Sequence, residues 1–173
     1  GNSTCTNNRA EAGGAIFTLQ RLTLDTSGGN ISFLGNTATD ANEGGADIYL
    51  NTDGNTTVTI KGDGNVLEMD GGFAGTGYIN KDGSNTLIFD RNADNTRFTG
   101  TFTQSAGTTL VHSDNFFGGE NIISGGSVLH FTGSARADNL ALKTGGILDL
   151  RSTDGYSPNT LTVAALQSAG SAV

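Results

Sequence analysis

The stretch Gly126-Ser127-Val128-Leu129-His130-Phe131 decides how this chain is expected to fold. It begins with glycine, and its two apolar residues Leu129 and Phe131 then stand two positions apart. Residues two apart on a β-strand lie on the same face of that strand. The stretch therefore predicts a short strand after a tight corner, where glycine adopts backbone conformations that other residues avoid.

The same six-residue unit recurs along the chain. Its further copies span residues 14–19, 45–50, 64–69, 84–89, 107–112 and 145–150. The first apolar position of each copy falls at residues 17, 48, 67, 87, 110, 129 and 148, so the intervals are 31, 19, 20, 23, 19 and 19. A spacing near 20 residues is typical of one coil of a β-solenoid.

The repeat predicts an all-β chain that forms a right-handed parallel β-helix with about 19–23 residues per rung and longer insertions at residues 20–47 and 89–109. We expect residues 1–173 to be a single β-helix segment and a piece of a longer protein. The predicted inner column is Phe17/Leu19, Ile48/Leu50, Leu67/Met69, Leu87/Phe89, Leu110/His112, Leu129/Phe131 and Leu148/Leu150. The residues between these pairs are expected to point outward: Thr18, Tyr49, Glu68, Ile88, Val111, His130 and Asp149.

A second, weaker apolar column is expected on another wall of the same core. Its candidates are Val58/Ile60, Tyr78, Phe98, Ile122, Leu140/Leu142 and Leu161/Val163. Short strands with glycine turns also build antiparallel sandwiches and barrels, in which four Asp-Gly pairs would form hairpin turns. These pairs are Asp53-Gly54, Asp63-Gly64, Asp70-Gly71 and Asp82-Gly83. The in-phase column of seven units favours the β-helix.

Composition excludes some classes of function. The formal net charge is -8, which argues against nucleic-acid binding because a phosphate backbone attracts a basic surface. Cys5 is the one cysteine, so neither an intrachain disulfide nor a cysteine zinc site can form. The sequence contains no apolar run of about 20 residues that would span a membrane as a helix.

The strand repeats resemble those of autotransporter passenger domains of Gram-negative bacteria. Residues 95–100, read as Asn-Thr-Arg-Phe-Thr-Gly, are similar to the first half of the autotransporter-associated strand repeat, with one extra residue. Residues 106–111, 125–129 and 145–148 are similar to its second half. In addition, Gly13-Gly14-Ala15-Ile16 and Phe33-Leu34-Gly35-Asn36 resemble the GGAI and FxxN motifs of polymorphic outer-membrane proteins. The sequence has one copy of each, and it lacks the family's translocator domain.

Residues that could perform chemistry have simpler explanations in this sequence. His112 occupies an expected inner position and should be a partnered, partly buried residue. His130 and Asp149 should be neighbours on adjacent rungs and form an exposed pair worth about 0–1 kcal/mol. Ser127 lacks the closing glycine of a nucleophile elbow. Asp63, Asp70, Asp82, Asp90 and Asp94 are explained by turn chemistry, and nothing in the sequence places Lys61 or Lys81 beside them.

The sequence therefore predicts no catalytic residue, no cofactor site and no metal site, and it assigns no binding residue. The resemblance implies a non-enzymatic stalk or adhesin at the bacterial cell surface or secreted from it. Expected partners are a host-cell or extracellular-matrix receptor, a carbohydrate, or further copies of the chain, with membrane contact only through a translocator domain absent from this sequence. The alternative is a carbohydrate-active β-helix enzyme, a polysaccharide lyase or hydrolase that uses paired carboxylates.

Overall fold

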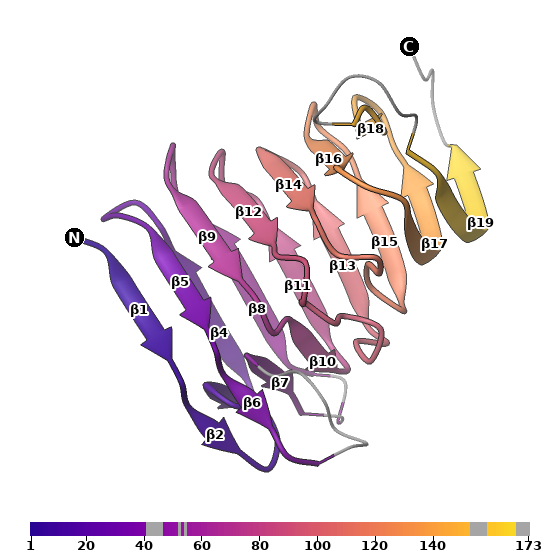
Figure 1. Ribbon diagram of the computed structural model, residues 1–173. Coiled ribbons are helices and arrows are strands. Elements are labelled where there is room, and N and C mark those ends of the chain that lie inside the picture. Colours follow the sequence, from indigo (N-terminus) through magenta and orange to yellow (C-terminus); the bar gives the residue numbers. More distant parts are fainter. Residues whose placement is uncertain (41–46, 52, 54, 153–158, 169–173) are drawn as a thin grey trace.

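The computed structural model describes residues 1–40, 47–51, 53, 55–152 and 159–168, and its regular secondary structure is entirely β-strand (Figure 1). These residues contain no helix, and hence none that could cross a membrane. Every pairing between the described strands is parallel, from β1 with β5 to β17 with β19. The predicted parallel β-solenoid is confirmed, and the antiparallel alternative is wrong. Gly45, Ala46 and Gly54 of the predicted motifs lie outside the described residues.

Two seven-stranded sheets form the long walls of the solenoid (Figure 1). Sheet 1 consists of β1 (Ser3–Thr6), β5 (Ile31–Leu34), β9 (Val66–Met69), β12 (Thr86–Phe89), β14 (Thr108–Val111), β16 (Val128–Phe131) and β18 (Ile147–Asp149). Sheet 2 consists of β4 (Arg21–Asp25), β8 (Thr57–Lys61), β11 (Tyr78–Lys81), β13 (Thr101–Gln104), β15 (Glu120–Ile123), β17 (Ala135–Leu142) and β19 (Leu161–Ser168).

Two smaller sheets belong to the N-terminal half. Sheet 3 consists of β3 (Ile16–Thr18), β7 (Ile48–Leu50) and β10 (Phe73–Gly75), and sheet 4 consists of β2 (Arg9–Ala10) and β6 (Thr37–Ala38). The chain visits sheet 1, sheet 3 and sheet 2 in turn from β9 through β11. This coil therefore carries a strand on one wall besides the two long sheets, and the coils β1–β4 and β5–β8 carry strands on two such walls, in sheets 4 and 3.

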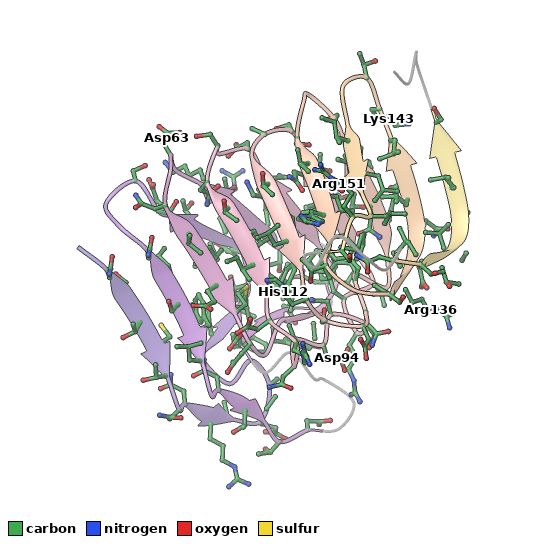
Figure 2. The ribbon with its side chains drawn as sticks, turned by 45° about the horizontal axis from the view of Figure 1, so that its top comes forward. Asp63, Asp94, His112, Arg136, Lys143 and Arg151 are labelled. Atoms are coloured by element: carbon green, nitrogen blue, oxygen red, sulfur yellow. The ribbon has the colours of Figure 1, made fainter. Side chains whose placement is uncertain are left out.

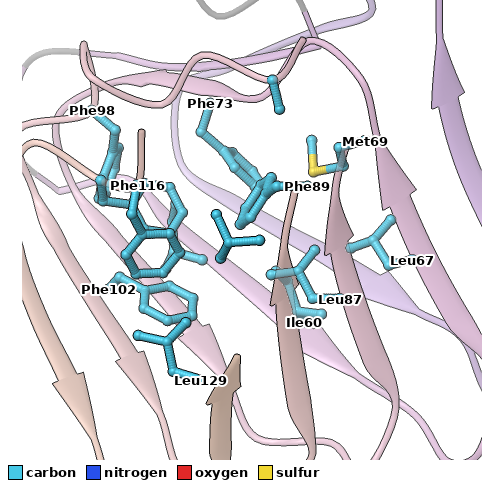
Figure 3. Close-up of a cluster of buried hydrophobic side chains, with 14 of the residues drawn as sticks. Ile60, Leu67, Met69, Phe73, Leu87, Phe89, Phe98, Phe102, Phe116 and Leu129 are labelled. Atoms are coloured by element: carbon cyan, nitrogen blue, oxygen red, sulfur yellow. The ribbon is translucent and has the colours of Figure 1, made fainter. Parts of the chain in front are cut away.

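The inner face of sheet 1 is almost wholly apolar. Leu67 aligns with Leu87, and both are fully buried, as is Leu129 (Figure 3). Beside them, Met69 aligns with Phe89 to form the next buried column. This is the arrangement that the repeat predicts for the middle rungs. Because each rung buries little apolar area alone, the stacked columns supply the stability.

The predicted register is wrong by one residue at β14. Leu110 aligns with Ile88 and His130 on the outer face, whereas Thr109 and Val111 are buried. The sequence Thr-Thr-Leu-Val offers either alternation. The observed one places Val111 in the core and keeps the His112 imidazole out of it, which avoids the cost of burying a polar ring.

The first two predicted pairs are also placed differently from the expectation. β3 pairs with β7 through Ile16 and Ile48, so Phe17 and Leu19 point outward with 48% and 59% of their surface exposed. Ile48 and Leu50 are buried as predicted, but in sheet 3. The inner positions of sheet 1 at this level belong to β5, where Phe33 aligns with Met69. The six-residue unit did not detect β5.

Sheet 2 bears out part of the second predicted column. Val58, Ile60 and Leu140 are buried, and Leu142, Leu161 and Val163 pack on the core while partly exposed. The prediction is wrong for Tyr78 and Ile122, whose neighbours are buried instead: Ile79 and Lys81 in β11, and Asn121 and Ile123 in β15. Phe98 is buried, but it lies beside Gly75 on the third wall.

Phenylalanine rings fill the centre of the solenoid (Figure 3). The ring centroids of Phe116 and Phe117, which follow one another in the segment between β14 and β15, lie 4.7 Å apart. Phe117 also contacts Phe89 and Phe102 with centroid distances of 5.4 and 4.8 Å. Aromatic pairs in such tilted and edge-to-face arrangements are worth about 0.5–1.5 kcal/mol beyond the area that they bury. The rings therefore couple sheet 1 to sheet 2.

Candidate functional site

His130 and Asp149 are neighbours on the outer face of sheet 1, as predicted. Each of them, however, makes its hydrogen bonds with Arg151. His130 aligns with Asp149, and its Nε2 lies 2.9 Å from the carbonyl oxygen of Arg151. The Arg151 guanidinium donates to both carboxylate oxygens of Asp149, at 2.6 Å from Nη2 to Oδ2. These hydrogen bonds hold the pKa of the Asp149 carboxyl well below its usual range. The arrangement is an ion pair at the surface rather than a histidine base oriented by a carboxylate.

His112 is partnered and partly buried, as expected for a structural histidine. Its Nδ1 lies 2.7 Å from the Thr132 hydroxyl oxygen, and that hydroxyl donates to the carbonyl oxygen of Val111 at 3.2 Å. The inner position predicted for His112 is wrong, because Val111 takes it. The imidazole instead links two neighbouring rungs at the end of β14.

Three of the aspartates that the sequence assigned to turns accept hydrogen bonds, Asp94 within its own turn and the other two from a neighbouring coil. Asp63 accepts from the Ser84 hydroxyl at 2.9 Å, and Asp70 accepts from the Gly35 amide at 2.8 Å. Asp94 accepts from both the amide and the hydroxyl of Thr96. Asp63, Asp94 and His112 lie at separate places along the solenoid (Figure 2). Across the described residues, no group of three or more histidine, cysteine, aspartate or glutamate side chains could hold a metal ion.

The two lysines considered as partners for these carboxylates have different positions. Lys61 lies at the surface and forms an ion pair with Asp25, with 3.2 Å between Nζ and Oδ2. Hydrogen bonds from Ser27, together with Lys61, lower the pKa of Asp25 to about 2. Lys81, in contrast, points into the core and is fully buried.

The ammonium of Lys81 lies among oxygen atoms at a corner of the solenoid. It donates to the carbonyl oxygens of Gly83, Asn85 and Ala106 at 2.9, 2.7 and 3.1 Å. It also donates to the side-chain oxygen of Asn85 at 3.1 Å. Burial lowers the pKa of Lys81 to about 8, although Asp82 opposes this shift. The sequence did not predict the burial of Lys81, because its neighbours resemble those of an exposed lysine.

A second buried charge lies where the FxxN motif meets sheet 3. Asp47 accepts from the amides of Gly71 and Gly72 at 2.8 and 2.9 Å, and from the side-chain amide of Asn36 at 2.9 Å. Burial raises the pKa of Asp47 to about 6 despite these hydrogen bonds. Asn36 also accepts from the side-chain amide of Asn8 at 2.9 Å. The asparagine of the motif is therefore structural here, since it ties a corner together across three coils.

The Ser127 hydroxyl and the Cys5 thiol, which are potential nucleophiles, have structural roles as well. The Ser127 hydroxyl is buried and donates to the carbonyl oxygens of Ser124 and Gln104. Cys5 is a free thiol that aligns with Phe33 and packs partly against the core. Neither group has a base beside it among the hydrogen bonds of the described residues.

The described residues also form hollows at the surface. One, of about 290 Å³, is lined by Thr96, Asn115, Phe116, Phe117, Gly118, Arg136, Ala137 and Asp138. Another, of about 480 Å³, lies at the corner between β3 and β4 and is lined by Leu19, Gln20, Arg21, Asp53 and Asn55. Only the second has large exposed apolar side chains next to it, and it is the better candidate for a binding site.

Comparison with known proteins gives no relative of this chain: no family model, no curated protein and no solved structure matches it.

Proposed function

We propose that this solenoid is a rigid, non-catalytic scaffold of an autotransporter passenger domain, displayed at the bacterial cell surface or released from it, and that it binds a host receptor or a carbohydrate. The main observation behind the proposal is that the polar side chains of the solenoid make hydrogen bonds within the scaffold itself. The histidines and aspartates that could perform chemistry make hydrogen bonds within turns and between rungs. A stable parallel scaffold with free outer faces is suited to display and binding.

The resemblance of the strand repeats supports the same function. Leu129 and Phe98, each from a segment similar to the autotransporter-associated strand repeat, are fully buried. Phe33 and Asn36 of the FxxN segment are buried as well, at 1% and 4% exposure. The residues on which the resemblance rests are thus buried between the strands and stabilise the coil, which is the role expected of them in a passenger domain.

Binding to surfaces tests this proposal. Beads coated with the folded protein are expected to adhere to epithelial cells or to immobilised matrix proteins more than beads coated with the heat-unfolded protein. The same preparation should leave a panel of polysaccharides uncleaved. Release of reducing ends or of unsaturated products, abolished by substitution of Asp63, Asp70 or Asp94, would instead establish the carbohydrate-active enzyme.

Head-to-tail association is a second candidate function, expected of isolated copies of this segment and favoured by the ends of the described solenoid. The partly buried apolar residues that pack on the core lie near these two ends. At the N-terminal end they are Cys5, Ala15, Ile16, Leu22 and Ile31, and at the C-terminal end they are Leu142, Leu148, Leu150, Leu161 and Val163. The edge strands β1, β4, β18 and β19 have an unpaired side in the described structure.

Sedimentation velocity over a range of concentrations tests association. We expect the mass-averaged sedimentation coefficient to rise with concentration and Leu166→Lys, on the exposed β19, to suppress that rise. Leu166 is 60% exposed, so the substitution should not unfold the chain. A strict monomer at every concentration would rule out this second function and leave the first untouched.

A further inference from the structure

Exposed apolar side chains gather around one corner of the solenoid. Phe17 and Leu19 are 48% and 59% exposed, and both lie beside the turn between β3 and β4. Tyr78, which is 50% exposed, lies two rungs along from Arg21 on the same outer face of sheet 2. Most large apolar side chains of the described residues are buried, and the other exposed ones, Ile147 and Leu166, lie in β18 and β19. A group of exposed apolar side chains at one corner indicates a contact surface.

Phe17 presents a fixed aromatic surface at this corner. Its ring stacks on that of Tyr49, with 5.3 Å between centroids and 17° between the ring planes. Tyr49 itself is only 5% exposed, and its ring lies against that of Phe17. The stacking holds the Phe17 ring in place before any ligand arrives, which lowers the entropy lost on binding.

Polar groups converge on the hollow beside this aromatic surface. Gln20, Arg21, Asp53 and Asn55 line it together with the exposed Leu19, which follows Phe17 by two residues in the sequence. The Asp53 carboxylate accepts from the amide of Asn55 at 3.1 Å, which orients the carboxylate. The corner therefore offers an apolar ring face next to side-chain donors and acceptors, and its volume of about 480 Å³ falls in the range of small-ligand sites.

This combination matches the chemistry of a sugar. A pyranose ring has an apolar face of C–H groups, which can pack on an aromatic ring, and a rim of hydroxyl groups, which need donors and acceptors. An acidic sugar fits less well, because Asp53 offsets Arg21 in the hollow and the chain carries a net charge of -8. A purely apolar ligand would leave the polar rim unpaired.

We propose that the corner formed by Phe17, Leu19, Gln20, Arg21, Asp53 and Asn55 binds a neutral sugar unit of a glycan, with its apolar face on the Phe17 ring. The proposal rests on the proposed function and names the ligand class of that binding scaffold. It assigns the aromatic contact to Phe17 and the hydroxyl contacts to the polar residues of the hollow.

Saturation-transfer NMR and calorimetry with defined probes test the site. The probes are the neutral tetrasaccharides of glucose, mannose and N-acetylglucosamine, with a polygalacturonate oligomer as the acidic comparison. At least one neutral probe should bind to the unmodified protein, and Phe17→Ala should weaken that binding about tenfold or more. Ile147→Ala is the matched control, since Ile147 is 49% exposed but lies on sheet 1, and it should leave affinity unchanged.

Each other outcome overturns the inference. Absence of binding to any neutral probe does so, as does neutral-sugar binding that Phe17→Ala and Ile147→Ala weaken equally. Binding of polygalacturonate alone, lost at high salt, would indicate general charge attraction. If no neutral sugar binds while coated beads still adhere to cells, the sugar site is ruled out and the proposed function is retained. Urea unfolding of Phe17→Ala should remain cooperative with a modestly lower midpoint, because the half-exposed ring is lost together with its stacking on Tyr49.

Discussion

Sheets 1 and 2 use the same coil geometry but fill it with different residues. The inner columns of sheet 1 are apolar through the middle rungs, with Thr109 as the exception. The inner columns of sheet 2 hold buried polar residues in consecutive rungs, namely Lys81, Gln104 and Asn121. Sheet 1 therefore depends mainly on the hydrophobic effect, whereas sheet 2 also depends on hydrogen bonds at its corners.

This contrast explains what each sheet reveals in the sequence. A pair of apolar residues two apart marks a strand wherever both inner positions are apolar, as at Leu87 and Phe89. In β11 the inner residues are Ile79 and Lys81, so the more conspicuous Tyr78 suggests the opposite face. A buried polar residue with its own hydrogen bonds is consistent with a core position but cannot be recognised from alternation alone.

Removing an aromatic ring from sheet 1 should have the largest effect. Phe89 is fully buried and contacts Phe73, Phe116 and Phe117. Phe89→Ala is expected to lower the free energy of unfolding by about 3–5 kcal/mol, since it removes buried area and leaves a cavity. Urea unfolding followed by circular dichroism measures this change. Phe89→Leu keeps most of the volume and should cost clearly less; equal costs would show that the rings are not closely packed.

Replacing the buried ammonium of sheet 2 should have an intermediate effect. Lys81→Met keeps the apolar stem but leaves the carbonyl oxygens of Gly83 and Ala106 without their donor. We expect a loss of about 2 kcal/mol in the free energy of unfolding, because an unpaired buried polar group costs about 1–3 kcal/mol. Lys61→Met, at the exposed end of β8, is the control and should change little. A Lys81→Met protein more stable than the parent would mean that desolvating the charge outweighs its hydrogen bonds.

The pH dependence of stability gives a second measure of the buried ammonium in sheet 2. The pKa of Lys81 falls from 10.5 to about 8 in the folded state, so the folded chain loses this proton at lower pH than the unfolded chain. The stability of the unmodified protein should therefore rise relative to that of Lys81→Met as pH increases from about 8 to 10.5. Paired urea titrations at pH 7.5 and 10 measure the difference. A difference that stays constant would show that Lys81 titrates alike in both states.

Truncation on the outer face of sheet 2 should have the smallest effect. Tyr78→Ala removes a half-exposed ring whose neighbours in β8 and β13 are threonines. The expected change in the free energy of unfolding is within about 0.5 kcal/mol, as is usual for surface substitutions. The urea midpoint measures it. A loss comparable to that of Phe89→Ala would contradict the assignment of Tyr78 to the outer face.

The repeat predicts the parallel coil and the middle rungs of sheet 1, because stacked apolar pairs at a fixed spacing leave few other ways to bury them. It misplaces Phe17 and Leu110, where a neighbouring residue offers an equally acceptable alternation. The His130–Asp149 contact follows from the register, but the intervention of Arg151 does not, since it depends on the course of the chain after β18. The hollow beside Phe17 is lined by side chains from two separate corner segments, and the spacing of apolar residues does not predict that these side chains converge.

The oxygen cage around Lys81 resembles in its donor atoms the sites in which carbonyl groups replace the hydration shell of a potassium ion. Here the cation is tethered to the chain by a covalent stem. Unlike a bound metal ion, the Lys81 ammonium cannot dissociate on dilution or be removed by a chelating agent. This corner therefore keeps its positive charge without any ion from solution, as long as the pH stays below the Lys81 pKa of about 8.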